Sequence, residues 1–320
     1  MRKFALLILL IIVLGSWVLA QDGTRTPSEP TSVSPDQSTS VPQAAGPTSL
    51  HLQPDASGTV PQEQIRELLR RVAEKDIEND KHQRDYTYIQ RQEEHRLDGN
   101  GNVKKVESRT SEVLQIYGEQ VERLIAKDDK PLPEKDARKE EEKIQKIIDK
   151  RKNESESDRR KRIEKEEKDR EDGRKFVKEV ADAYNFHLVG SELLDGHDTW
   201  ALDAEPRPGY EPKFKEAKFL PKLKGRIWID KVETQWVKLD VTTTDTISFG
   251  LFLARIHKGT RVVVDTTRIN DEVWLPKHVQ FHVDVRLALL KNFNVDVEQT
   301  FRDYKKFRSE SKITLVGESQ

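Results

Sequence analysis

The strongest constraint on the fold is a strictly alternating segment, residues 279–289, which runs Val-Gln-Phe-His-Val-Asp-Val-Arg-Leu-Ala-Leu. Every odd position is apolar and most even positions are polar. Because successive side chains of a strand point to opposite faces, this pattern predicts a strand with one buried face. Short polar separators divide the neighbouring apolar segments, which predict strands at 226–230, 236–242, 262–269, 272–275, 277–290 and 295–304. Parallel neighbours would need crossovers of about a dozen residues, so we predict an antiparallel sheet.

Two hairpins are predicted earlier in the chain. One surrounds Asp195-Gly196, and the other turns at residues 98–102, Asp-Gly-Asn-Gly-Asn. The second turn also resembles a calcium loop, since oxygen ligands fall at its first, third and fifth places. However, the sixth place is Val103 and the twelfth is Arg109, where an EF-hand needs glycine and glutamate. We therefore predict a hairpin turn there.

A helix over about residues 60–77 is expected to cover this sheet. Ile65, Leu68, Leu69 and Val72 recur at three- and four-residue spacing and form one apolar stripe. The predicted fold class is α+β, mainly antiparallel β. We expect a strongly curved sheet or unclosed barrel of about nine to eleven strands, with the covering N-terminal helix and an inserted charged helical arm.

The charged arm spans residues 134–172, which hold 15 acidic and 15 basic side chains. Such residues favour helix and can pair at three- and four-residue offsets. Asn153, Ser155 and Ser157 predict a break with a helix cap, giving two helices. We favour a solvated insertion, because charge runs usually form solvated faces. The alternative is an arm that recognises a protein partner.

Composition limits the remaining possibilities. Charged residues make up 35% of the chain and hydrophobic residues 34%, which favours one compact domain with solvated segments. The chain has no cysteine, so disulfides, thiolate nucleophiles and cysteine-ligated zinc are excluded. The formal net charge of −1 gives no reason to expect nucleic acid as a partner.

The N-terminal 20 residues have the order of a signal peptide: Arg2-Lys3, an apolar run, then Ala20. An uncleaved membrane anchor is the alternative, but spanning a bilayer takes about 20 apolar residues and Gly15-Ser16 interrupts the run. We expect a signal peptide at 1–20, a disordered linker at 21–58, a domain at 59–310 and a flexible tail at 311–320. We predict that the protein is located in the bacterial periplasm or is secreted. Without cysteine the chain is not a lipoprotein.

A family resemblance is carried by three segments: Gly-Arg-Ile-Trp-Ile-Asp at 225–230, Trp-Val-Lys-Leu-Asp at 236–240, and Glu-Val-Trp-Leu-Pro-Lys at 272–277. Together with the predicted signal peptide and the predicted N-terminal helix, these segments resemble the LolA-like superfamily of periplasmic lipoprotein carriers and sorting proteins, with LolB and RseB as relatives. The resemblance covers roughly residues 60–307. It implies an incomplete antiparallel barrel that encloses an apolar cavity for acyl chains, and it transfers no functional residue.

The sequence contains no recognisable catalytic motif. His278, His282 and Asp284 share one strand face, which we interpret as a solvated polar face and not as a metal or acid–base site. We expect no enzyme activity, no metal and no cofactor.

Residues 247–254 are apolar at nearly every position, typical of a strand buried on both faces or of a flap over a cavity. We interpret this segment, and likewise Trp228 and Trp236, as ordinary packing. The candidate ligand-binding residues are Trp228, Trp236, Phe249, Leu251, Phe252 and Leu253.

The predicted function is that of an exported carrier or binding protein for a hydrophobic ligand, a lipid or an acylated polypeptide. Peripheral or transient membrane contact is compatible with it. The alternative is an envelope interaction or stress-sensor module that contacts a protein partner through residues 134–172.

Overall fold

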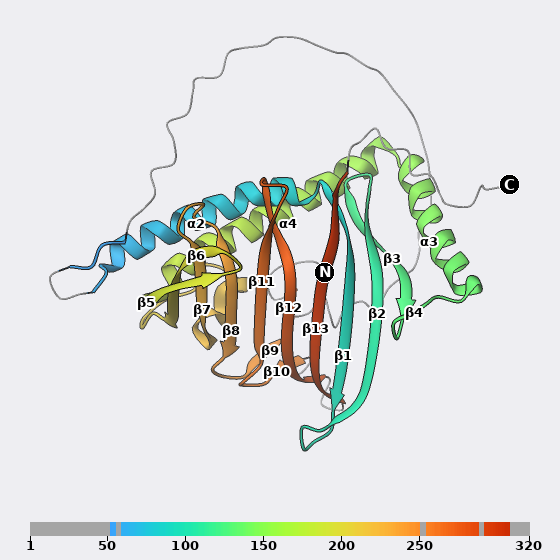
Figure 1. Cartoon of the computed structure of the whole chain (residues 1–320). Helices are drawn as coiled ribbons and strands as arrows, with labels where there is room; N and C mark the ends of the chain where they lie inside the picture. Colours follow the sequence, from blue (N-terminus) through green and yellow to red (C-terminus); the bar gives the residue numbers. More distant parts are fainter. Residues whose placement is uncertain (1–51, 56–58, 250–253, 288–290, 308–320) are drawn as a thin grey trace, which may run out of the picture. The chain divides into compact units, whose positions relative to one another are not determined.

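The computed structural model describes residues 52–55, 59–249, 254–287 and 291–307 (Figure 1). The chain forms two compact units, each assembled from two separate stretches. Unit 1 contains the residues up to 74 and residues 149–236, whereas unit 2 contains residues 75–148 and those from 237 onward. The predicted signal peptide, most of the predicted linker and the predicted tail lie outside the described residues. Within the described part, no helix combines the length and apolar character needed to cross a bilayer.

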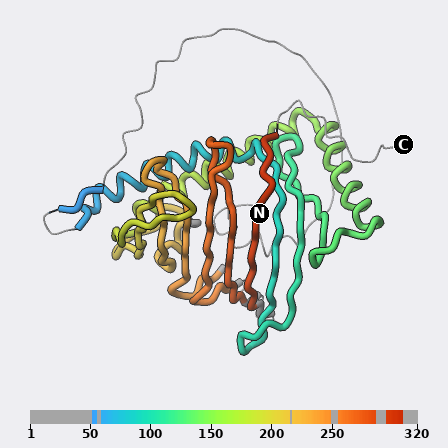
Figure 2. Tube along the Cα trace, in the orientation of Figure 1, coloured from blue at the N-terminus to red at the C-terminus, as the bar shows by residue number. Residues whose placement is uncertain are grey.

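Unit 2 is built on an open antiparallel sheet with the strand order β4-β3-β2-β1-β13-β12-β11-β8. Within the described residues, β4 and β8 do not pair with each other, so these strands do not close into a barrel. Figure 2 shows β13, near the C-terminus, lying beside β1, although the two strands are far apart in sequence. The strands are β1 (Tyr86–Leu97), β2 (Val103–Ile116), β3 (Glu119–Lys127), β4 (Lys130–Pro131), β8 (Trp236–Thr243), β9 (Ile247–Phe249), β10 (Ala254–Ile256), β11 (Arg261–Ile269), β12 (Val273–Leu287) and β13 (Lys291–Lys306).

The alternating segment that predicted the sheet lies in β12. Its odd-numbered side chains from Val279 to Val285 are buried, as expected for a strand with one apolar face. The predicted division of this region into strands 272–275 and 277–290 is wrong, because β12 runs unbroken through Pro276. A register shift against β11 accommodates the proline: His278 pairs with Asp265, and Pro276 pairs with Thr266. The residue between them, Lys277, is the extra residue of a bulge.

The turn at residues 98–102 is a hairpin turn, as predicted. The Asp98 carboxylate accepts hydrogen bonds from the backbone N–H groups of Asn100 (2.8 Å) and Asn102 (2.9 Å). These bonds lower the pKa of Asp98, the bond from Asn102 contributing most. The oxygens that suggested a calcium loop therefore stabilise the turn itself.

Unit 1 contains the antiparallel strands β5 (Tyr184–Leu194), β6 (His197–Pro206) and β7 (Leu223–Asp230). The predicted Asp195-Gly196 turn joins β5 to β6, and both residues have positive φ, 49° and 86°. Helix α4 (Glu156–Ala183) packs on the 3-10 helix η1 (Lys215–Lys222), where the rings of Phe176 and Phe219 lie 5.7 Å apart. The second half of α4 is thus fixed by its apolar side chains.

Helix α2 (Gln62–Gln83) is longer than predicted, but the predicted apolar stripe is buried. In unit 2 its Asn79 side chain forms two hydrogen bonds to the backbone of Trp274, at the start of β12, both 2.8 Å long. In unit 1 its Gln62 side chain also forms two hydrogen bonds, one with the N–H and one with the C=O of Phe186 in β5. Side-chain amides on the helix therefore satisfy backbone groups of a strand in each unit.

The charged arm forms two helices, as predicted: α3 (Glu134–Lys152) and α4, separated by residues 153–155. Ser155 is the N-cap of α4, where its Oγ accepts a hydrogen bond from Asp158 N at 3.1 Å. In α3, Ile144 is buried, and the Glu140 carboxylate accepts a hydrogen bond from Leu124 N in β3 at 3.2 Å. Helix α3 is therefore held against β3.

Candidate functional site

One face of the unit 2 sheet carries a continuous set of apolar side chains, which we call the valine face. Residues directly opposite in paired strands point to the same face. The register therefore joins the apolar side chains of β12 to those of β13 and β11. The side chains of β12 and β13 in this set are 0–4% exposed. They are Val279, Phe281, Val283, Val285, Val295 and Val297.

The valine face becomes polar where the sheet passes from β13 to β1 and β2. One cross-strand row begins at Leu239 in β8 and ends at Lys127 in β3. In the middle of this row, Gln299 Nε2 donates a hydrogen bond to Gln92 Oε1 at 3.0 Å. The full row is Leu239, Val264, Val279, Gln299, Gln92, Arg109 and Lys127. The next row also changes from apolar to polar side chains at β1. It consists of Val241, Val262, Phe281, Val297, Glu94 and Glu107.

We define the polar strip as the six side chains of β1 and β2 that continue the valine face: Gln92, Glu94, Arg96, Lys105, Glu107 and Arg109. Arg96 lies 2.8 Å from the Glu94 carboxylate and 3.3 Å from that of Glu107. Lys105 lies 2.8 Å from Glu107. The hydrogen bond from Lys105 lowers the pKa of Glu107, and the charges of Arg96 and Arg109 act in the same direction.

An aromatic cluster lies on the same face, at the start of β1 and the end of β13. Tyr88 packs against Tyr304 and Phe301, with ring centroids 5.2 Å and 5.9 Å away. Burial raises the pKa of Tyr88 to about 12, and the Glu122 carboxylate contributes in the same direction. The face thus joins buried apolar side chains to an ionic strip in the neighbouring strands.

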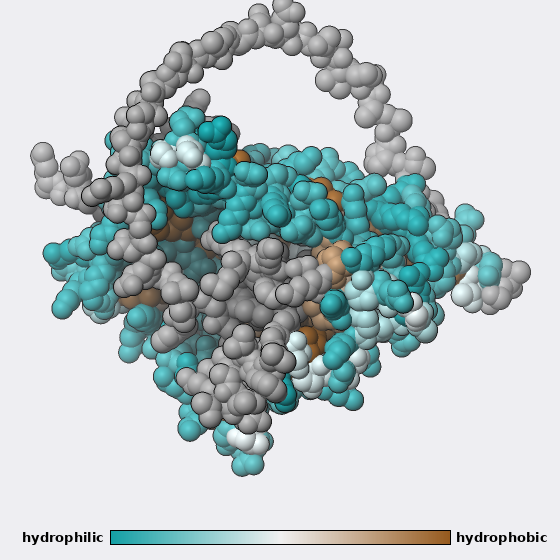
Figure 3. All heavy atoms as spheres, turned by 180° about the vertical axis from the view of Figure 1, so that it is seen from behind, coloured by the Kyte–Doolittle hydropathy of each residue, from teal (hydrophilic) through white to brown (hydrophobic). Residues whose placement is uncertain are grey.

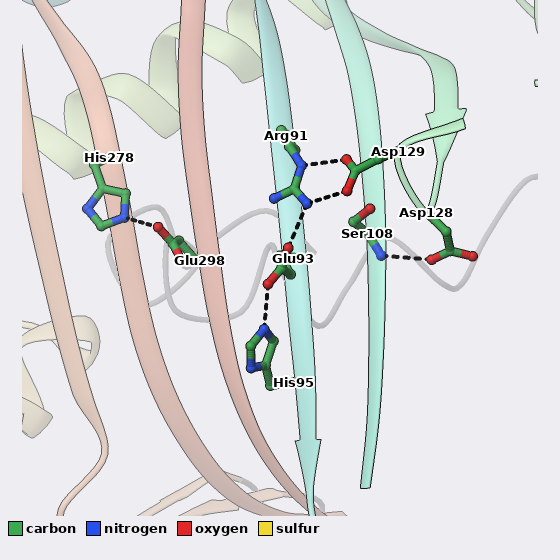
Figure 4. A network of polar contacts seen from close by, with 8 residues as sticks. All are labelled: Arg91, Glu93, His95, Ser108, Asp128, Asp129, His278 and Glu298. Carbon is green, nitrogen blue, oxygen red and sulfur yellow. Dashed lines mark hydrogen bonds and ion pairs between the residues drawn. The ribbon is translucent and has the colours of Figure 1, made fainter. Parts of the chain in front are cut away.

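The opposite face of this sheet, which we call the histidine face, carries paired charges (Figure 4). Arg91 binds both oxygens of Asp129, each at 2.7 Å, and also contacts Glu93 at 2.6 Å. Glu93 in turn lies 2.6 Å from His95 Nε2. These partners lower the pKa of Glu93, the hydrogen bond with His95 contributing most.

The two histidines predicted to lie on a polar face are on the histidine face, and both contact carboxylates of β13. His278 Nε2 is 2.9 Å from Glu298, and His282 Nδ1 is 2.6 Å from Asp296. Asp296 is the cross-strand neighbour of His282. Among the described residues, no group of three or more histidine and acidic side chains is arranged to hold a metal ion.

The two candidate tryptophans belong to unit 1. Trp228, in β7, is buried, and its Nε1 donates a hydrogen bond to Glu192 Oε2 at 2.9 Å. Arg226 lies over its ring, 5.8 Å from the centroid. Trp236, the first residue of β8, is half-buried. Trp228 thus has the contacts of a packed structural residue.

The other four candidates belong to the segment that links β9 to β10 in unit 2. Leu251, Phe252 and Leu253 lie outside the described residues, and so does the side chain of Phe249. The ends of the segment are defined: β9 pairs with β10, and β10 pairs with β12 over residues 285–287. The segment therefore ends at a strand that pairs with β12, and β9, where it begins, pairs with that same strand.

The polar strip was not predicted from the sequence. Strand β1 is polar on both faces from Gln90 to Arg96, so its own pattern does not distinguish a ligand-facing side from a solvated one. The informative signal is the change along alternate positions from Tyr88 to Gln90, Gln92 and Glu94. Its meaning depends on β13 being the neighbouring strand, which no local pattern specifies.

Comparisons with known proteins give distant structural similarities. No family model and no curated protein matches the chain. A DUF1329 family protein from Desulfovibrio piger is 11% identical, with a TM-score of 0.29 over 78% of this chain and 95% of that one. A LolA superfamily protein from Nitrosomonas europaea is 10% identical, with a TM-score of 0.30 over 76% and 94%.

A domain from Vibrio parahaemolyticus, described as an outer membrane lipoprotein-sorting protein, is 11% identical, with a TM-score of 0.24 over 75% and 95%. Two of these three structures carry names from the group that the sequence resembles. The architecture described above rests on the strand register of this chain itself.

Proposed function

We propose that the chain is an exported, non-catalytic carrier or binding protein for a hydrophobic ligand, a lipid or an acylated polypeptide, in the bacterial envelope. The observation that carries this proposal is the valine face of an unclosed sheet, which continues directly into the polar strip. Binding sites for small apolar molecules combine a large apolar surface with a few placed polar groups. The valine face and the polar strip supply both in adjacent strands.

Binding without catalysis is supported by how the ionisable groups are used. On the histidine face, His95, His278 and His282 each contact a carboxylate. On the polar strip, Glu94 and Glu107 are each held by a basic neighbour. Such pairs fix strand register and surface charge, which is what a rigid binding scaffold needs.

We further propose that the segment between β9 and β10 closes over the bound ligand. Its attachment to β12 supports this, because β12 carries four side chains of the valine face. Leu251 and Leu253 would then contact the ligand, together with Phe249 and Phe252. Trp228 and Trp236, which belong to unit 1, stay predicted ligand contacts independently of this segment.

The test is titration of the full chain with a fluorescent fatty acid. Leu251→Asp and Leu253→Asp should weaken binding about tenfold or more, because a carboxylate placed against an acyl chain is not solvated. Leu193→Asp is the matched control: Leu193, in β5 of unit 1, is 75% exposed, and its variant should bind like the parent. Equal affinity in all three variants would contradict the closing segment, and absence of binding by the parent would contradict the proposed function.

A second candidate function is an interaction or sensor module that uses the charged arm. One observation favours it: the break between α3 and α4 is fixed by Glu154, which accepts hydrogen bonds from Arg151 and Arg162. An arm with a defined bend can present a fixed pattern of charge to a protein. Native mass spectrometry separates the candidates, since copurifying lipid supports the carrier and a lipid-free protein bound to an envelope protein supports the arm.

A further inference from the structure

We propose that the edge of strand β5 in unit 1 binds an extended segment of a partner protein as an added strand, and that basic and apolar residues alternate in this segment. Within the described residues, β5 pairs with β6 alone, so its outer backbone groups have no strand partner. An uncovered strand edge presents N–H and C=O groups with which an extended chain can pair. The proposal concerns unit 1 and is independent of the valine face in unit 2.

Other strand edges of the molecule are covered by side chains from a helix. In unit 2, the Glu140 carboxylate of α3 accepts a hydrogen bond from Leu124 N at the edge of β3. In unit 1, the Gln62 amide of α2 binds the N–H and the C=O of Phe186, and it thereby covers the first residues of β5. Proteins commonly cover or charge their strand edges, because an open edge pairs readily with another chain.

The rest of β5 is open to solvent. Leu193 is 75% exposed and Val189 is 52% exposed. The strand contains no lysine, arginine or proline, which often protect an edge, and its one acidic residue is Glu192. A bulge at Val189 interrupts the pairing with β6, so the added strand is expected along residues 190–194. The exposed side chains of β5 are His187, Val189, Ser191, Glu192 and Leu193.

The side chains of this edge specify an alternating partner. Glu192 and Leu193 point to opposite faces, because successive residues of a strand do. On the first face, Glu192 Oε2 accepts a hydrogen bond from Trp228 Nε1 at 2.9 Å, which orients the carboxylate. Neighbouring side chains of an added strand would lie beside Glu192 on one face and beside Leu193 on the other. A basic residue complements the first position and an apolar residue the second.

The charge at this end of the unit 1 sheet is acidic. Residues 191–200 and 229–235 form the end of the sheet where β5 turns into β6 and where β7 ends. They carry five acidic residues and a single lysine. A basic partner is therefore favoured over an acidic one. The charged residues are Glu192, Asp195, Asp198, Asp230, Glu233 and Lys231.

The basic side chains near β5 are already held by acids of unit 1. Lys231 lies 2.8 Å from Asp198, and Arg226 lies 2.6 Å from Asp203. Arg226 is farther from Glu192, at 4.0 Å, and the Glu192 side chain is 44% exposed. A basic residue of an added strand can therefore approach Glu192 from the open edge.

The test uses two fluorescent hexapeptides of the same composition and charge, Lys-Val-Lys-Val-Lys-Val and Lys-Lys-Lys-Val-Val-Val, both with blocked ends. Binding to the full chain is measured by fluorescence anisotropy. We expect the alternating peptide to bind about tenfold more tightly, because it alone places all its lysines on one face of a strand and all its valines on the other. Attraction by charge alone would be equal for the two peptides.

Hydrogen exchange locates the added strand. The segment 190–194 should exchange more slowly when the alternating peptide is bound, because pairing protects backbone amides from exchange. Strand β3, whose edge is covered by α3, serves as the internal reference and should be unchanged.

A pair of matched variants tests the assignment to β5. Leu193→Lys should weaken binding of the alternating peptide about tenfold, because it removes the apolar contact and places a lysine on the edge. Val106→Lys makes the same kind of change at a 50% exposed position in β2 of unit 2, and it should bind like the parent. Unchanged thermal unfolding of both variants controls for folding.

Each alternative outcome is decisive. Equal affinity for the two peptides, unchanged affinity in Leu193→Lys, or slower exchange only outside β5 would overturn the proposal. A dimer of the peptide-free chain in light scattering, with residues 190–194 protected, would show that a second copy occupies the edge and that the assigned partner is wrong. The carrier proposal is tested separately, since none of these measurements involves a fatty acid.

Discussion

The side chain of Glu154 stabilises the break between α3 and α4. Its carboxylate is 8% exposed and accepts hydrogen bonds from Arg162 Nε (3.1 Å), Arg162 Nη2 (2.9 Å) and Arg151 Nη1 (3.4 Å). Glu154→Ala would leave both guanidinium groups without this acceptor. We expect the free energy of unfolding to fall by about 1 to 2 kcal/mol, measured by urea unfolding followed by circular dichroism.

The same residue predicts a pH dependence. The hydrogen bond from Arg162 lowers the pKa of Glu154 in the folded chain. A carboxyl group with a lowered folded pKa stabilises the fold above its unfolded pKa, and this contribution disappears as the pH falls through the folded value. The stability difference between the parent and Glu154→Ala should therefore persist at neutral pH and shrink only in acid, below the ordinary glutamate range. Glu164→Ala, at an exposed position in the same helix, should change neither quantity.

Helix α2 shows at the scale of an element how a helix is fixed on a strand. Asn79 is 7% exposed, and its side-chain amide satisfies both the N–H and the C=O of Trp274. Asn79→Ala removes both of these hydrogen bonds, whereas the Trp274 carbonyl keeps a longer one from Gln83 Nε2 at 3.4 Å. Since losing the partner of a buried polar group costs about 1 to 3 kcal/mol, we expect a loss of about that size in thermal or urea unfolding. Lys81→Ala, an exposed change in the same helix, is the control, and an equal effect in both variants would contradict the role of Asn79.

Elements with a local signature could be predicted from the sequence. The stripe from Ile65 to Val72 predicted α2, and the alternation after Val279 predicted the buried face of β12. The sequence predicts a strand boundary at Pro276, whereas β12 continues through it by means of a bulge that depends on β11. The prediction failed where the structure depends on the partner strand.

The candidate site illustrates this limit more clearly. Gln92 and Gln299 are 207 residues apart in sequence and 3.0 Å apart in space. Neither residue is unusual within its own strand, so composition and periodicity give no reason to single them out. Only the pairing of β1 with β13 places the polar strip on the same face as the valines. Residues such as Gln92 and Glu94 become part of the candidate site through strand order, a property of the whole chain.

At the scale of the whole molecule, each compact unit is made from two separated stretches of chain. Local sequence patterns do not reveal such a division, because the stretches of one unit are no more alike than those of different units. The predicted boundary of a single domain at 59–310 stays a prediction. The division does locate the two candidate functions, since the valine face belongs to unit 2 and residues 149–172 of the charged arm belong to unit 1.

This location gives a prediction that separates the two functions within the intact chain. Arg159, Arg160 and Lys161 are consecutive exposed residues in the first turns of α4. Their joint replacement by glutamate reverses the local charge without touching a side chain of the valine face or the polar strip. We expect the affinity for a fluorescent fatty acid to stay within about twofold of the parent, because the three side chains belong to unit 1 and none is part of the valine face or the polar strip.

The same triple variant should lose any envelope protein that the parent captures through its arm. The matched control is Glu134→Gln/Lys135→Gln, which alters the exposed start of α3 without changing the net charge. The described surface in Figure 3 is mostly hydrophilic, with small apolar patches, so recognition by charge is the mode that an arm of this composition supports. A tenfold loss of fatty-acid affinity in the triple variant would show that the arm contributes to the ligand site. Retained affinity with loss of a protein partner would show that one chain carries both functions on different elements.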